Sequence, residues 1–199
     1  MTTTAHTSPS PSRSVARSLV ELLKHRASQS EIAAHIDGLG PAARLEQLRE
    51  VRGPWVGRLY DAVGGAEPLT PSDLVPEGEK GTVIFEGTNS LPMFSFFQKR
   101  FAREGDTVYG YNHQTWSFVT GPGYFLVRPP TPGEAHPDEL FFDYTAETPA
   151  GLAGWPARRG NDVGVSRAVD MNRKDFCRRV GKGTLVGKAY KLGVAQNAY

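Results

Sequence analysis

The chain has 199 residues, of which 39% are hydrophobic and 22% charged, a composition that is typical of a globular protein and argues against a disordered one. Its 22 glycines and 15 prolines predict many turns and short elements, which favours a β-rich fold over an all-helical one. Cys177 is the single cysteine, which excludes an internal disulfide and a cysteine-based zinc site, and no apolar run approaches the ~18 residues of a membrane helix, so we expect a soluble, cytoplasmic protein with no transmembrane segment.

Residues 1–12 are rich in serine and threonine and predict a disordered tail, with an organelle transit peptide as the alternative interpretation. Residues 13–66 are predicted to be a helical segment. Two short helices come first, the second with Ser30 as its N-cap. A longer amphipathic stretch follows, and Gly53 with Pro54 should kink it or split it in two. Its apolar stripe consists of Leu45, Leu48, Val51, Trp55, Leu59 and Val63.

Residues 67–80 are rich in proline and acidic residues and predict a linker. Residues 81–199 are predicted to form a β-rich, barrel-like domain with one inserted helix over residues 90–104. Ser90 caps this helix, whose apolar stripe of Met93, Phe94, Phe97 and Phe101 is expected to cover the sheet as a lid. The fold class is therefore α+β, with N-terminal helices followed by an antiparallel β-barrel or strongly curved sheet. The expected strands lie within residues 81–89, 108–120, 124–128, 140–145, 163–171, 176–180 and 185–192.

Aromatic and polar residues are mixed through residues 106–130. In an extended strand, alternation places Tyr109, Tyr111 and His113 on one face. Trp116 then lies on the other face. Aromatic rings with a few hydrogen-bonding groups are typical of a cavity wall that holds an apolar ligand. The structural alternative is a cross-strand aromatic ladder with a hydrogen-bonded histidine.

Four side chains are candidates for acid–base catalysis in this cavity, namely His113, Tyr111, Asp143 and Glu86. Imidazole titrates near neutral pH, and a carboxylate surrounded by rings, such as Asp143, can have a raised pKa. An alternating strand would instead point Asp143 to solvent. Arg167 stands between valines and either faces outward or anchors a carboxylate or phosphate. The ligand-binding candidates are Tyr109, Trp116, Tyr124, Phe94, Phe97, Asn89 and Arg167.

Three sharper motifs fail when their spacing is checked. The segment GKGTLVGKA lacks the G-x4-G-K-[ST] spacing of a phosphate loop, and GVSRA has no histidine after its serine, as an α/β-hydrolase requires. His136 and Asp138 have the H-x-D spacing of an iron facial triad, but no second histidine follows them. The prediction therefore includes no metal and no cofactor.

We expect the protein to bind a mostly apolar small molecule, lipid-, isoprenoid- or polyketide-like, in an aromatic-lined cavity. The alternative is a small acid–base enzyme, an isomerase or cyclase, that uses the same cavity. A weaker alternative is interaction with nucleic acid or protein through the chain from Gly151 onward, where 10 Lys and Arg against 3 Asp give a net charge of +7. The aromatic residues there are not interleaved with the charges at strand spacing, which disfavours nucleic acid. The sequence does not define the oligomeric state.

Overall fold

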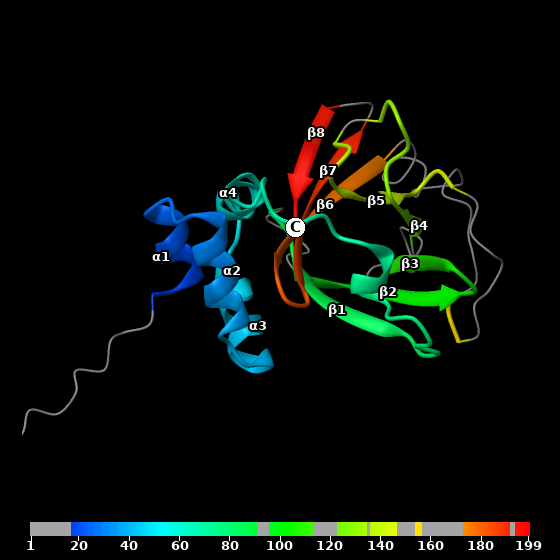
Figure 1. The fold of residues 1–199 in the computed structure, drawn as a ribbon, viewed down its shortest axis with the longest axis horizontal. Helices are drawn as coiled ribbons and strands as arrows, with labels where there is room; N and C mark the ends of the chain where they lie inside the picture. The colour runs from blue at the N-terminus through cyan, green and yellow to red at the C-terminus, as the bar shows by residue number, and fades with distance from the viewer. Residues whose placement is uncertain are drawn as a thin grey trace, which may run out of the picture.

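Helices occupy the first part of the chain and strands the remainder. The computed structural model describes residues 17–90, 96–113, 123–134, 136–146, 154–156, 173–191 and 194–199. Over this range the protein has five helices and an eight-stranded antiparallel sheet, which confirms the predicted α+β class. Helices α1 to α4 pack as one group beside the curved sheet (Figure 1).

The helices are short, and serine side chains cap the first two. The helices are α1 Leu19–Lys24, α2 Gln29–Asp37, α3 Pro41–Glu50, α4 Pro54–Ala62 and α5 Pro71–Leu74. The Ser28 hydroxyl accepts a hydrogen bond from the Glu31 backbone N–H, and the Glu31 carboxylate accepts one from the Ser28 N–H, which together form a capping box. The prediction of Ser30 as the N-cap is therefore wrong, because Ser30 lies inside α2. None of the helices in the described ranges is long and apolar enough to cross a membrane.

The break between α3 and α4 lies where the sequence predicts it. Gly53 has a φ of +54°, a left-handed backbone that glycine adopts without a side-chain clash. Pro54 then begins α4, where its missing N–H costs no helical hydrogen bond. Further along, the segment predicted as a linker contains α5 and buries Leu74 and Val75.

Each strand of the sheet pairs with its neighbour in the sequence. The strands are β1 Val83–Thr88, β2 Phe96–Glu104, β3 Thr107–His113, β4 Tyr124–Arg128, β5 Leu140–Asp143, β6 Arg173–Gly181, β7 Thr184–Lys191 and β8 Val194–Ala198. The order in the sheet is β1 to β8 without a crossover, and the pairs are antiparallel throughout. The chain is thus a simple meander.

The sheet is strongly curved but does not close, so the barrel alternative of the prediction is wrong. β8 is short, and its register with β7 shifts between Lys188 and Tyr190. The two sheet edges approach each other at one point, where the Ser90 N–H donates to the Ala198 carbonyl at 2.9 Å. We call this junction between the end of β1 and the end of β8 the seam. The Ala198 N–H also donates to the Ser90 hydroxyl at 3.3 Å, but these two hydrogen bonds do not make a strand pair.

The helix predicted over residues 90–104 is also wrong, because residues 96–104 form β2. Phe97 and Phe101 are four residues apart, a spacing that puts them on one face of a helix and equally on one face of a strand. Lys99 lies between them on the same strand face. Pairing of β2 with both β1 and β3 decides in favour of the strand. The proposed lid residue Phe94 lies outside the described residues.

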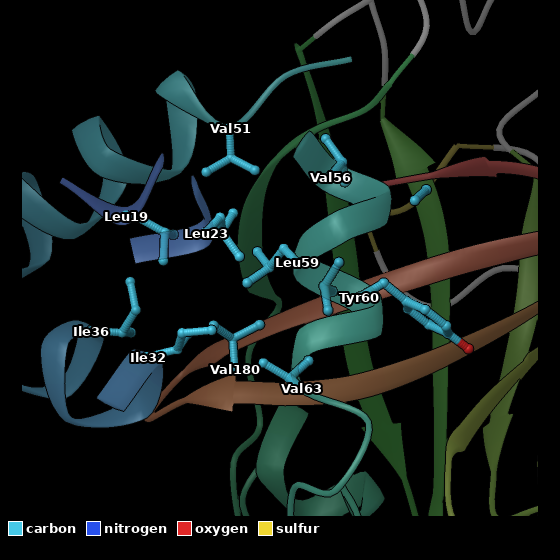
Figure 2. Packing of buried hydrophobic residues seen from close by; sticks show 12 residues of the cluster. Leu19, Leu23, Ile32, Ile36, Val51, Val56, Leu59, Tyr60, Val63 and Val180 are labelled. Atoms are coloured by element: carbon cyan, nitrogen blue, oxygen red, sulfur yellow. The ribbon is translucent and has the colours of Figure 1, made fainter. Parts of the chain in front are cut away.

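Two hydrophobic cores lie on opposite faces of the sheet. The helix–sheet core joins the four helices to Val180, Val186 and Ala198 of the last three strands (Figure 2). The inner core fills the concave face of the sheet and is dominated by aromatic rings. Its buried residues are Leu69, Leu74, Val75, Phe101, Val108, Phe125, Val127, Leu140, Phe142, Tyr144, Cys177 and Tyr199.

Candidate functional site

A pocket of about 80 Å³ lies where α3 and α4 meet β1, β2 and the start of β7. It reaches from the helix–sheet core toward the inner core. Eleven of its lining residues are apolar or glycine, which makes the wall suitable for hydrocarbon. These residues are Leu48, Val51, Val56, Leu59, Phe85, Gly87, Phe97, Phe101, Gly183, Leu185 and Val186. We call this space the seam pocket.

Thr184, the first residue of β7, is the unusual polar residue of the seam pocket. Its side chain is only 5% exposed, and its hydroxyl is buried with no hydrogen-bond partner among the described residues. Buried polar atoms in native proteins nearly always have a partner, and leaving one unpaired costs about 1–3 kcal/mol. The hydroxyl therefore requires an explanation, and a polar atom in the adjoining pocket provides one.

Lys99 of β2 lines the same pocket and is the centre of a buried polar cluster. Its Nζ donates at 2.9 Å to Asn112 Oδ1 and at 2.9 Å to Tyr144 Oη. Asp175 Oδ2 lies 3.5 Å from the same Nζ, with side-chain exposures of 5% for Lys99 and 0% for Asp175. The ammonium thus donates to two buried acceptors, and the Asp175 carboxylate balances its charge.

Tyr199 connects this cluster to the pocket. Its Oη donates to Asp175 Oδ2 at 2.7 Å, and Lys99 Nζ lies 4.4 Å from the centre of its ring. The ring fits because Gly187 faces it, where a Cβ atom would lie only 2.5 Å from the Tyr199 ring. Burial, together with the nearby charge of Asp175, raises the pKa of Tyr199 well above its usual value, so the phenol stays protonated. Burial likewise raises the pKa of the neighbouring Cys177 thiol.

The sequence-predicted aromatic face of β3 lies on the side of the sheet opposite the inner core. Tyr111 is buried there, and its ring centre lies 5.5 Å from that of Tyr124 and 4.7 Å from that of Trp155. Burial raises the pKa of Tyr124 to about 12. The structure therefore brings Tyr111 and Tyr124 together with Trp155, at a place separate from the seam pocket.

His113 lies beside Tyr111, with ring centres 6.2 Å apart. Its pKa is lowered, first by burial and then by the nearby Arg100 guanidinium, so the imidazole is neutral near pH 7. Arg100 also donates to Tyr111 Oη at 3.3 Å. Tyr109 is half-buried on the same face. His113 and Tyr111 thus neighbour each other, but the catalytic role predicted for them stays a prediction.

The remaining predicted site residues are dispersed. Phe97 and Glu86 line the seam pocket, and Glu86 accepts a hydrogen bond from Gln98 at 2.8 Å. Asp143 is buried on the outer face, where it accepts from Arg128 at 2.9 Å and from the Thr145 hydroxyl at 2.6 Å. Asn89 is half-buried near the end of β1. Trp116, Phe94 and Arg167 lie outside the described residues.

Sequence reasoning missed the residues that define the seam pocket. The helix predicted over residues 90–104 contains Lys99, and the predicted site residues include neither Thr184 nor Asp175. A signal was present for Lys99, since reading residues 97–101 with the strand period puts a lysine between two phenylalanines on the buried face. Nothing in the sequence around Thr184 distinguishes it from an ordinary strand threonine.

Among the residues that the structure describes, no three His, Cys, Asp or Glu side chains come together in an arrangement that could hold a metal ion. Comparison with protein-family models, with curated proteins and with solved structures gave no match. The function must therefore be inferred from the geometry of this chain.

Proposed function

We propose that the protein binds a small, mostly apolar molecule that carries one hydrogen-bonding group, with the seam pocket as its site. The unpaired Thr184 hydroxyl carries this proposal, because it offers a buried donor and acceptor to whatever occupies the pocket. The apolar walls from α3, α4, β1 and β2 would take the hydrocarbon part of the ligand. This is the small-molecule binding expected from the sequence, at a different place.

The charges around the pocket favour a neutral polar group on the ligand. Lys99 is balanced by Asp175, and its N–H groups are directed to protein acceptors. A carboxylate in the pocket would be desolvated without a counter-charge of its own, which is costly. An alcohol or ketone avoids that cost and satisfies Thr184. The volume of about 80 Å³ is below the ~300 Å³ of common ligand sites, so it suits a short molecule or one end of a longer chain.

Short- and medium-chain alcohols, with the matching fatty acids, are suitable probes for calorimetric titration. We expect the alcohols to bind more tightly than the acids. Thr184→Val keeps the side-chain shape and should weaken the alcohols by ~10-fold, the equivalent of one net hydrogen bond. The same change should stabilise the free protein, because the unpaired hydroxyl is gone.

Leu48→Trp fills the pocket from α3 and should abolish binding, whereas Ala43→Trp on the exposed side of the same helix should leave it intact. Absence of binding by every probe in the wild type, or equal binding in the Leu48→Trp protein, would contradict the proposal. Native mass spectrometry of protein purified from its own host then identifies the natural ligand.

The second candidate is proton-transfer chemistry in the same pocket, as in the isomerase or cyclase alternative. The observation that favours it is the hydrogen-bonded chain from Tyr199 to Asp175 and Lys99, which ends at a pocket-lining phenol. In such a chain Tyr199 can take a proton from a bound ligand as it passes its own to Asp175. Tyr199→Phe keeps the ring and removes the proton. Loss of substrate turnover in the Tyr199→Phe variant, with ligand binding retained, would favour an enzyme. Unchanged turnover would eliminate a catalytic role for Tyr199.

A further inference from the structure

A second pocket, of about 190 Å³, lies on the opposite side of β6 from the inner core, and its lining is polar. The loop before β5 contributes His136 and Glu139, and β6 contributes Arg178. None of these residues takes part in the seam pocket. We call this space the His136 pocket.

Glu139 is the buried centre of the groups around this pocket. Its side chain is 6% exposed, and its Oε1 accepts from Arg178 Nη2 at 3.0 Å. Its Oε2 accepts a hydrogen bond from the hydroxyl of Tyr60. Figure 2 shows the Tyr60 ring extending from α4 beyond the helix–sheet core, with its hydroxyl directed away from the aliphatic side chains. Burial, with the hydrogen bond to Glu139, raises the pKa of Tyr60, so the phenol remains a donor.

His136 is held in a defined orientation beside this carboxylate. Its Nδ1 lies 3.0 Å from Glu139 Oε1, within the reach of a base and the group that orients it. The imidazole packs against both Phe176 and Tyr190, with ring centres 4.8 and 5.1 Å away. The backbone of His136 has a φ of +60°, which is uncommon outside glycine and tends to occur at functional sites. Because Nδ1 lies beside the carboxylate, Nε2 is the ring nitrogen left for a ligand.

Arg178 supplies an unsatisfied donor at the same pocket. Two of its nitrogens are engaged, Nη1 with the Tyr60 carbonyl at 2.7 Å and Nη2 with Glu139 at 3.0 Å. Its Nε is buried and has no hydrogen-bond partner among the described residues. A guanidinium N–H left in this way requires an acceptor oxygen. A bound carbonyl group meets that requirement.

We propose that the His136 pocket hydrolyses esters of small carboxylic acids by general-base catalysis. His136 Nε2 removes a proton from a water molecule as the water oxygen bonds to the ester carbonyl carbon. The carbonyl electron pair moves to its oxygen, where the Arg178 Nε–H stabilises the negative charge. The tetrahedral intermediate then breaks its bond to the alcohol oxygen, which takes the proton back from the imidazolium. The products are a carboxylic acid and an alcohol, and no redox partner is needed. Glu139 is the positioning residue for His136.

The test uses p-nitrophenyl acetate with the full chain, and the release of p-nitrophenolate is followed by absorbance. His136→Asn is the main variant, because asparagine tolerates the left-handed backbone and removes the base. His136→Gly adopts the same backbone and is the second variant. His25→Asn is the matched control. His25 also neighbours a carboxylate, with its Nε2 3.8 Å from Glu21, but it is the C-cap residue of α1 and has a side-chain exposure of 69%.

We expect a wild-type rate that saturates with ester concentration, because hydrolysis requires the pocket. His136→Asn and His136→Gly should lower kcat by ~10² or more, the usual contribution of a general base. The His25 variant should keep the wild-type rate. Glu139→Gln should lower kcat with little change in KM, which a purely structural role would not produce.

Two results would overturn the proposal. One is a wild-type rate that is linear in ester concentration and equal to that of the His136 variants. The other is an equal loss in the His25 control, since that would identify non-specific imidazole reactivity. In either case the cluster of Tyr60, Glu139 and Arg178 is an ion-pair network that ties α4 to the sheet.

Discussion

Replacement of Lys99 by methionine tests whether the buried polar cluster is energetically coupled. Methionine approximates the length of the lysine side chain, so the main change is loss of the ammonium and its contacts with Asn112, Tyr144 and Asp175. Removing one partner of a buried ion pair costs about 3–5 kcal/mol, because the other charge stays buried without compensation. Asp175 retains the Tyr199 hydrogen bond at 2.7 Å, so we expect a value near the lower limit, about 3 kcal/mol.

Urea denaturation followed by fluorescence measures this loss as a lower midpoint with an unchanged m value. The double variant of Lys99→Met with Asp175→Asn should lose at least 1 kcal/mol less than the sum of the two single changes, because it leaves no unpaired charge. Lys188→Met is a matched control, since Lys188 pairs with an exposed Asp61 carboxylate at 3.2 Å and should cost less than about 1 kcal/mol. A Lys99→Met protein within 1 kcal/mol of the wild type, or strictly additive single changes, would refute the coupling.

Three further predictions concern stability and reactivity. Hydrogen bonds from Arg128 lower the pKa of Glu134 to about 2, so its carboxylate stabilises the fold above its unfolded pKa of about 4.5 and loses that effect as the pH falls toward 2. Glu134→Gln should therefore unfold at lower urea than the wild type at pH 6, with a difference of at most about 3 kcal/mol that disappears by pH 2. Cys177 is buried with a raised pKa, so Ellman's reagent should label it only after denaturant is added, and rapid labelling of the native protein would contradict its burial. Gly110→Ala places a Cβ 2.4 Å from a buried ring and should cost about 1–3 kcal/mol in thermal melts, whereas Gly57→Ala in α4 meets nothing within 4 Å and should stabilise the protein by about 0.5–1 kcal/mol.

The elements predicted correctly are those in which local chemistry decides the structure. β4 has its predicted bounds, Tyr124–Arg128, because apolar residues there are bounded by Gly123 and Pro129. Gly53 is the N-cap of α4 and Pro54 is its first residue, for reasons of local backbone chemistry. The alternation of β3 is also as expected.

The candidate site depends on long-range contacts, and so the sequence did not reveal it. Lys99 meets Tyr144 across 45 residues, a contact that depends on the order of the strands in the sheet. β2 was mistaken for a helix because the spacing of Phe97 and Phe101 fits both periods. Which face of β3 is the inner one is likewise decided by the partners of the strand rather than by its own residues. Likewise, the Thr184 hydroxyl is unpaired because of the residues that surround it in the fold, and its neighbours in the sequence do not reveal this.

The meander and its seam impose an order on folding. Most consecutive strands are close in the sequence, so their pairing closes short loops and forms early, whereas β5 and β6 are separated by the 29 residues 144–172. The seam instead joins Ser90 to Ala198 across more than half of the chain, so it carries a larger entropy of loop closure than the pairing of consecutive strands and should form later than those pairs. Amides at the seam are then among the first to exchange with solvent in the native state. The seam pocket lies beside this late contact. A ligand that binds there, in contact with α3 and β7, would therefore slow the opening of the seam.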